Sequence, residues 1–459
     1  VTAAVAATAV CMVVPTILAA QNWDDHDRSH RYMARDIGWN YLMSTLPNSI
    51  ILNYGDNDTF PLWNNQEVYG VRPDVRIMNT SYLGGEWYID EMKTKANKAP
   101  GVPFSLPKSK YTFVNDWVPV YDRVNRSVDI KEVMDFIRTD HPDSKIKMAD
   151  GSMVDYIPTK RIALPVNKEN AIASGIVAEK DRDKMVDTVY INLRKNSIDK
   201  NQLMILDMLA NFDWKRPIYM TQVYILQDFG LMDYLQFDGY AYRFVPILTP
   251  MQNPWEIGRV DADYAAPLLR DTFRYCLLYT SDPRVYADYF IQYNLSASHA
   301  RDSFARVAKE LLRQDRAQEA VELLDLGLER MPTWQIRFTD TNTYPFLEAY
   351  YAASAMGVEE AAAKGDALLR EYAQTLIEYI EYYLRFEGTQ GDMVSPILDE
   401  KLDQLGDIYY LATYAGRKEV VAELNTYYRS FGVSEDNLVD VGDKPRQADT
   451  TLIPKGMNE

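Results

Sequence analysis

Cysteine and histidine are scarce in this chain of 459 residues. Cys11 and Cys276 are too few for a disulfide framework or for a zinc site of the usual kind. Four histidines give no basis for a Ser–His–Asp arrangement: His26, His30, His141 and His299. The sequence also has no P-loop, G-x-G-x-x-G or H-E-x-x-H motif. The common signatures of nucleophilic, nucleotide-binding and zinc-dependent chemistry are therefore missing.

Basic residues are outnumbered, with 49 Lys and Arg against 66 Asp and Glu, so the net charge is −17. A surface of that sign repels phosphate backbones, which argues against nucleic-acid binding. The same charge disfavours docking of the folded part onto anionic lipid.

Charge is absent altogether from residues 1–20, VTAAVAATAVCMVVPTILAA. The run has about the 20 residues that a helix needs to cross a bilayer. A signal peptide would need a basic segment at its start, and a buried core helix would show a polar stripe. We therefore expect a transmembrane helix, the last one of a larger membrane region, in which Pro15 is tolerated.

An acidic junction comes directly after this run. It reads Asp24-Asp25-His26-Asp27-Arg28, in which the three aspartates and the histidine offer four potential oxygen or nitrogen ligands in five residues. They could form a metal or acceptor site at the membrane surface. The alternative is a solvated junction whose carboxylates pair with Arg28, Arg31 and Arg35. The acidic flank favours an extracytoplasmic position for the rest of the chain.

An α/β domain with a mainly parallel sheet is predicted for residues 21–255. A helix over residues 31–46 precedes a strand at 49–54, a polar turn, a helix at 60–70 and a strand at 74–79. That order predicts a βαβ unit with parallel strands. Residues 93–168 are interpreted as an insertion with short strands at 111–114 and 161–165. Further strands are expected at 187–193, 217–223 and 240–247, and a further helix is expected at 202–212.

A helical-repeat domain is predicted for residues 256–440. Residues 302–332, DSFARVAKELLRQDRAQEAVELLDLGLERMP, approach one tetratricopeptide unit, with small residues at Ala308, Ala320 and Gly327. Further helix pairs are expected around Gly357 and Gly416, since neither helix of such a pair can bury its apolar face alone. Residues 441–459 are polar and predicted to form a flexible tail.

The strongest local signal is the loop after the first strand, with Asp56, Asn57, Asp58 and Thr59. Ligands of open α/β sheets bind beyond the carboxyl ends of strands. Asp56 and Asp58 could hold a divalent cation, or the loop could bind sugar hydroxyls. A phosphatase of the haloacid dehalogenase type is disfavoured because the threonine falls one position early. The alternative is a turn that caps the next helix through Asp58 or Thr59.

Aromatic residues are abundant, with 33 Tyr and 8 Trp. Sugar-binding proteins combine aromatic faces with nearby carboxylates, so Trp63, Trp87, Tyr88 and Trp117 are candidate platforms. The alternative is ordinary packing of large side chains.

Several motifs resemble those of bacterial multi-pass membrane proteins related to protein O-mannosyltransferases, which are C-type glycosyltransferases. The motifs are QNWDDHDRSHRY (21–32), NYGDNDTFPLW (53–63), EVYGVRPD (67–74), WYIDEM (87–92), NFDWKRPIY (211–219) and DYLQFDGYAYRFVP (233–246). The resemblance implies a transferase that moves a sugar from a polyprenyl-phosphate carrier to protein. Its catalytic acid lies in an early loop outside this chain, so no catalytic residue is assigned here.

The resulting expectation is an extracytoplasmic, periplasmic region of an inner-membrane glycosyltransferase that aids the binding of acceptor protein or glycan. One alternative is a scaffold whose helical repeats hold a protein partner in a cell-envelope complex. Another is a metal-dependent hydrolase centred on Asp56 and Asp58.

Overall fold

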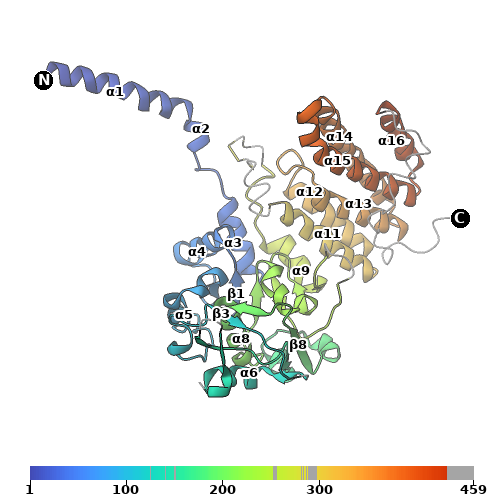
Figure 1. Cartoon of the computed structure of the whole chain (residues 1–459). Helices are drawn as coiled ribbons and strands as arrows, with labels where there is room; N and C mark the ends of the chain where they lie inside the picture. Colours follow the sequence, from blue (N-terminus) through green and yellow to red (C-terminus); the bar gives the residue numbers. More distant parts are fainter. Residues whose placement is uncertain are drawn as a thin grey trace.

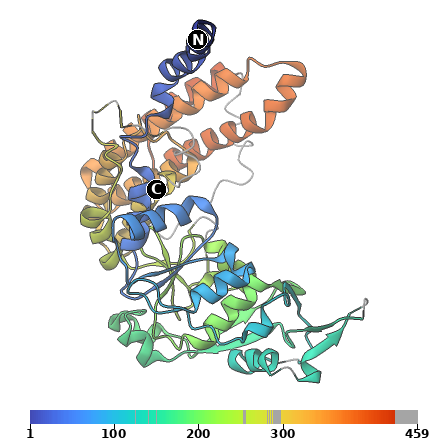
Figure 2. The same cartoon turned by 90° about the vertical axis from the view of Figure 1, so that its left-hand side faces the viewer.

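The computed structural model describes residues 1–124, 126–139, 141–148, 151–251, 256–280, 282, 284–285, 287 and 297–431. A mixed α/β region is followed by a helical region, and one long helix projects from the body at the N-terminus (Figure 1). In Figure 2 the helical region, yellow to red, lies above the α/β region, blue to green.

The projecting helix is α1 (Thr2–Gln21), which has no buried residue. Within the part of the chain that the structure describes, it is the one helix long and apolar enough to cross a membrane. A short helix, α2 (Trp23–His26), follows it. The predicted apolar helix at the N-terminus is confirmed, and its position in a membrane stays a prediction.

A six-stranded sheet forms the centre of the α/β region, in the order β13-β11-β12-β10-β1-β2. Its strands are β1 (Ile50–Asn53), β2 (Arg76–Asn79), β10 (Ile218–Met220), β11 (Leu235–Phe237), β12 (Tyr242–Phe244) and β13 (Arg259–Val260). Strand β1 is parallel to both β2 and β10. Helix α4 (Asp56–Trp63) and the π-helical turn η1 (Asn64–Val68) connect β1 to β2. The predicted βαβ unit is confirmed.

The prediction of a mainly parallel sheet is confirmed only in part, because the sheet is mixed. Strand β12 runs antiparallel to both β10 and β11. Residues 238–241 are all that connect β11 to β12, and a connection that short can join only antiparallel strands. Strand β13 pairs in parallel with β11 and carries the sheet past residue 255, where we expected the domain to end.

Alternate residues of the central strands face two separate cores. On one face lie α3 (Met33–Met43) and the helical region, and on the other lie α8 (Lys200–Asn211) and the insertion. Ile51 and Ile77 belong to the first core, whereas Ile50, Leu52 and Met78 belong to the second. Burial on both faces explains why apolar residues follow one another directly in β1 and β2, instead of alternating with polar ones.

The insertion and the segment that follows it, up to residue 199, carry small sheets. They are β3 (Trp117–Pro119) with β9 (Ser197–Asp199), β4 (Val128–Asp129) with β7 (Arg161–Pro165) and β8 (Thr188–Asn192), and β5 (Lys145–Lys147) with β6 (Met153–Asp155). The strands expected at 161–165 and 187–193 are confirmed, as is the helix at 202–212. The prediction of a strand at 111–114 is wrong. Phe113 and Asn115 have φ angles of 54° and 56°, which no extended strand contains.

The helical region follows α9 (Ala262–Pro267) and the π-helical turn η8 (Leu268–Thr272). It contains α11 (Ala297–Arg313), α12 (Ala317–Arg330), α13 (Asp340–Ala355), α14 (Glu359–Tyr383), α15 (Gly388–Tyr414) and α16 (Lys418–Ser430). Gly357 and Gly416 lie in turns with φ angles of 96° and 67°, as expected. A Cβ atom on Gly327 would lie 2.8 Å from the ring of Phe304, so α11 and α12 approach closely there. The predicted tail at 441–459 lies outside the described residues.

The α/β and helical regions are joined by polar contacts of the buried residues Asp36, Asn40 and Lys309. The Asn40 side chain exchanges two hydrogen bonds with the backbone of Arg274, at 2.9 and 2.8 Å. The amide of Cys276 donates to the carboxylate of Asp36. On α11, the Lys309 ammonium group lies 2.7 Å from Glu256 and 2.6 Å from Glu348. Helix α3 is thereby fixed to the segment that leads into the helical region, and α11 is fixed to Glu256 near the end of the α/β region.

Candidate functional site

Polar side chains stand at the carboxyl ends of three neighbouring parallel strands. Asn53 is the last residue of β1, Asn79 is the last residue of β2, and Thr221 follows β10 directly. Asn53 and Asn79 are also partners in the register of β1 and β2. All three side chains are buried. They define, with Asp58 and Thr59, what we call the strand-end cluster.

Thr59 lies at the centre of this cluster. Its Oγ1 accepts hydrogen bonds from Nδ2 of Asn53 and from Nδ2 of Asn79, the latter at 2.9 Å. The same hydroxyl donates to the carbonyl of Gly55. Helix α4 is thus connected to the ends of both β1 and β2.

Asp58 is buried, with an exposed fraction of 3%. Its Oδ2 accepts from the amide of Tyr54 at 3.1 Å and from the hydroxyl of Thr221. Burial raises the pKa of Asp58, and the hydrogen bonds from Thr221 and Tyr54 oppose that rise.

The alternative that Asp58 or Thr59 caps the next helix is wrong. Helix α4 begins at Asp56, and its N-cap is Gly55, with no side-chain cap hydrogen bond. Gly55 has a φ angle of 81°, which a glycine adopts without strain, and this lets the helix start directly after the strand. Asp58 and Thr59 therefore lie inside the first turns of α4, where they point to the strand ends.

Two oxygen atoms of the strand-end cluster lack a hydrogen-bond partner among the described residues. They are Oδ1 of Asn53 and Oδ1 of Asp58, and both are buried. Buried acceptors in folded proteins are nearly always paired with protein, water or ligand. Both atoms are acceptors, so a group that supplies O–H or N–H donors would complete the cluster.

Asp56 and Asn57 occupy a different environment from Asp58, because their side chains are exposed. In the described part of the chain, no three His, Cys, Asp or Glu side chains gather into a group that could hold a metal ion. Oδ2 of Asp58 already accepts hydrogen bonds from two protein donors, and the side chain of Asp56 is exposed to solvent. This arrangement suits a hydroxyl-bearing ligand better than the divalent cation considered for Asp56 and Asp58.

Four aromatic side chains extend from α4 to α5 (Glu86–Met92), and we call them the aromatic strip. Successive ring centroids are 6.0, 6.2 and 6.2 Å apart, along Phe60, Trp63, Tyr82 and Trp87. Phe60 is 52% exposed and Trp87 is 61% exposed, whereas Trp63 and Tyr82 are half-buried. Two of the four predicted aromatic platforms, Trp63 and Trp87, therefore belong to the aromatic strip.

The other two predicted platforms, Tyr88 and Trp117, lie outside the aromatic strip. Tyr88 is buried, and its hydroxyl accepts from the amide of Asn79 at 2.8 Å, so it is part of the core. Trp117 lies on β3, in a separate two-stranded sheet.

A pair of tyrosines borders the strand-end cluster. The rings of Tyr54 and Tyr224 meet edge to face with centroids 5.5 Å apart, and both side chains are exposed. Burial and the nearby charge of Asp58 raise the pKa of Tyr224. Sequence reasoning missed this pair as well as Asn53, Asn79 and Thr221. The signal was an asparagine at the end of each of two apolar strand segments, IILN and RIMN.

The acidic junction is separate from the strand-end cluster. Figure 1 shows α2 at the base of α1, away from α4 on the body. His26 is exposed and its Nδ1 lies 2.9 Å from the carbonyl of Asn22, and Arg28 is exposed too. The side chains of Asp24 and Asp25 lie outside the described part of the structure. Arg35, one of the expected pairing partners, bonds instead to Asp36 at 2.7 Å.

Comparison with known proteins connects the α/β region to a family. Residues 34–264, half of the chain, match the family model described as TMEM260-associated domain 2. The match runs from α3 into α9 and so includes all six strands of the central sheet and the strand-end cluster. No curated protein and no solved structure gives a significant match. The chain belongs to the TMEM260-associated domain 2 family.

Proposed function

We propose that this chain is the membrane-proximal, extracytoplasmic region of a membrane glycosyltransferase and that it holds the acceptor for the transfer reaction. The observation that carries the proposal is the strand-end cluster, in which Oδ1 of Asn53 and Oδ1 of Asp58 are buried without a hydrogen-bond partner among the described residues. The exposed side chains of Asp56 and Phe60 lie beside this cluster on α4. The transferase itself is inferred from the resemblance of the sequence motifs to protein O-mannosyltransferase relatives.

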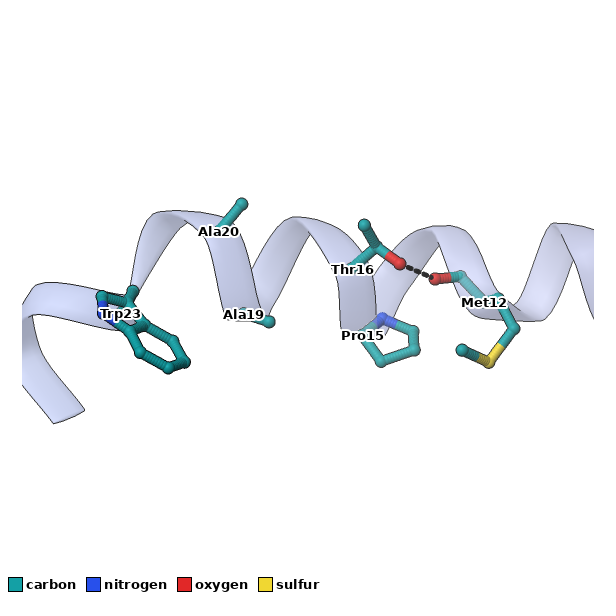
Figure 3. Close-up of a pocket in the computed structure, with 6 residues that line it drawn as sticks. All are labelled: Met12, Pro15, Thr16, Ala19, Ala20 and Trp23. Carbon is teal, nitrogen blue, oxygen red and sulfur yellow. Dashed lines mark hydrogen bonds between the residues drawn. The ribbon is translucent and has the colours of Figure 1, made fainter. Parts of the chain in front are cut away.

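Helix α1 supports a position at the inner membrane. Its surface is apolar over its length, and the hollow along it is lined by Met12, Pro15, Ala19 and Trp23 among others (Figure 3). The hydroxyl of Thr16 donates to the carbonyl of Met12 at 2.7 Å, so it does not face lipid unpaired. Trp23 is 71% exposed at the end of the span, where tryptophan is enriched at membrane interfaces.

The position of α1 also suits an acceptor site near the membrane. Helix α1 leaves the body on the side that carries α4 and α5 (Figure 1). The aromatic strip and the strand-end cluster belong to that same side, since α4 contributes to both. The acceptor would then be held between the body and the membrane, in the periplasm.

A binding role fits Asp58 better than a catalytic one. The carboxylate is buried, and one of its oxygens already accepts two hydrogen bonds. A general acid or base needs a direct approach to the reacting atom. In the C-type glycosyltransferases that the sequence motifs resemble, the catalytic acid lies in an early loop, so the resemblance assigns no catalytic role to Asp58.

A second candidate function is that of a protein-interaction scaffold, and the far end of the helical region favours it. Around the connection between α14 and α15, apolar side chains are exposed: Tyr382 and Leu384 each at 52% and Met393 at 75%. Exposed apolar groups that gather in one place mark interaction sites. The tetratricopeptide-like interpretation of these helix pairs belongs to this proposal.

The test is an Asp56→Asn, Asp58→Asn double variant in the full-length protein, assayed for sugar transfer. Asparagine keeps the size of aspartate and removes both charges. We expect transfer to be lost while the melting temperature is kept. The matched control is Asp392→Asn with Asp399→Asn, which removes two exposed carboxylates from α15 and should leave transfer intact. Wild-type transfer in the Asp56/Asp58 variant would refute the acceptor role of the cluster.

A further inference from the structure

The aromatic strip is too exposed to be explained by packing alone. Phe60 and Trp87 at its two ends present more than half of their surface to solvent, and the rings between them remain half-buried. Single exposed aromatic residues need no explanation, but a continuous series of four in ring-to-ring contact does. Large rigid rings supply contact area at a low cost in conformational entropy.

Acidic groups stand at both ends of the strip. At the α4 end, Phe60 follows the exposed Asp56 and Asn57 within the same helix. At the α5 end, Trp87 follows Glu86, whose Oε2 is buried without a hydrogen-bond partner among the described residues. The strip therefore offers flat apolar faces between hydrogen-bond acceptors.

That combination selects a particular class of ligand. A pyranose ring has an apolar C–H face, which stacks on aromatic rings, and hydroxyl groups at its edge, which donate to carboxylates. An anionic lipid headgroup is disfavoured because the carboxylates at the strip ends, and the net charge of −17, repel it. A neutral oligosaccharide meets no such repulsion.

We propose that the aromatic strip binds a neutral oligosaccharide whose sugar rings stack along Phe60, Trp63, Tyr82 and Trp87, with hydroxyl groups donating to Asp56 and Glu86. The inference rests on the proposed function and names its ligand: a sugar chain already carried by the acceptor. The strand-end cluster lies next to the Phe60 end of the strip, because Asp58 and Phe60 share the first two turns of α4.

The experiment uses the full chain in neutral-lipid nanodiscs with mannotriose, maltotriose and chitotriose as probes. Binding is followed by saturation-transfer NMR and by tryptophan fluorescence. We expect at least one trisaccharide to bind, and we expect Phe60→Ala with Trp87→Ala to weaken that binding by about tenfold or more. The matched control is Trp117→Ala, which removes a tryptophan that is 49% exposed on β3 and should leave binding unchanged.

Three results would overturn the inference. They are absence of binding for every trisaccharide, unchanged binding in the Phe60/Trp87 variant, and equal loss in the Trp117 control. An unglycosylated hexapeptide and empty vesicles are tested in parallel, and strip-dependent binding to either in place of sugar also counts against it. If no sugar binds while the Asp56/Asp58 variant still loses transfer, the sugar ligand is rejected and the proposed acceptor role stands.

Discussion

The carboxylate of Asp58 accepts a hydrogen bond from the hydroxyl of Thr221, and this bond joins α4 to the end of β10. The two residues are 163 positions apart in the sequence. Both side chains are buried, so the bond is shielded from water. The strand-end cluster therefore exists only when the whole α/β region is folded.

Loss of the Thr221 hydroxyl should destabilise the protein. In Thr221→Val, Oδ2 of Asp58 retains only the amide of Tyr54 as a donor. We expect the free energy of unfolding to fall by about 1–3 kcal/mol, the usual cost of leaving a buried acceptor without its partner. Urea unfolding measures this, with Thr221→Ser as the control that keeps the hydroxyl. Equal losses in both variants would show that packing, and not the hydrogen bond, is responsible.

The raised pKa of Asp58 predicts a specific dependence of stability on pH. As the pH rises from the ordinary value of 3.8 to the raised pKa, the unfolded chain releases this proton before the folded protein does. The unfolded state therefore binds fewer protons in that window, and the contribution of Asp58 to stability falls there and stays lower above it.

Asp58→Asn removes this titration. The unfolding free energy of the variant minus that of the wild type should increase with pH through the window and then level off. Urea unfolding of both proteins between pH 3.5 and pH 7 gives this difference, in which the other carboxylates cancel. A difference that is independent of pH would contradict the raised pKa.

Lys309 is predicted to be essential to the junction of the two regions. Its side chain is 2% exposed and lies between Glu256 and Glu348. Lys309→Met would remove the cation that lies 2.6 Å from the buried Glu348, at a cost of about 3–5 kcal/mol. Glu256 is half-buried and keeps Arg313 at 3.6 Å, so it contributes less to this cost. Lys364→Met is the control, because its pair with Asp325 is partly exposed and should contribute less than about 1 kcal/mol. Thermal unfolding compares the two, and similar melting temperatures would contradict the prediction.

Removal of residues 1–26 should give a protein that is soluble without detergent. Helix α1 has no buried residue, so its loss opens no cavity in the folded body. We expect the unfolding free energy to stay within about 0.5 kcal/mol of the full chain, as for surface changes in general. Size-exclusion chromatography and urea unfolding test both points. Aggregation or a large loss of stability would mean that α1 packs on the body.

The sequence predicted the local elements of the fold better than their long-range arrangement. The segment from β1 to β2 was recognisable because two short apolar strands flank one helical segment, and consecutive strands joined in this way are parallel. The direction of β12 was missed because the pattern of a strand does not reveal its neighbours. It is set by the short 238–241 connection and by pairing with β10.

The residues of the candidate site likewise fall into two groups: those that the sequence revealed and those that only the folded structure brings to the site. Asp56, Asp58 and Thr59 were found because they follow a strand in the chain, and Trp63 and Trp87 because tryptophan is conspicuous. Thr221, Tyr224 and Tyr82 reach the site only through sheet register and ring contacts. Those are properties of the folded state that no local pattern contains.

One apolar core extends from α3 through α11 to α16, so the helical region is not a module on a flexible tether. The spacing between the α14–α15 connection and the start of α3 is consequently fixed by the fold. If α1 anchors the chain in a membrane, a partner held at that connection stands at a constant height above the lipid surface. The helical region would then act as a spacer of defined length, and its number of helices would set the distance between the membrane and the bound partner.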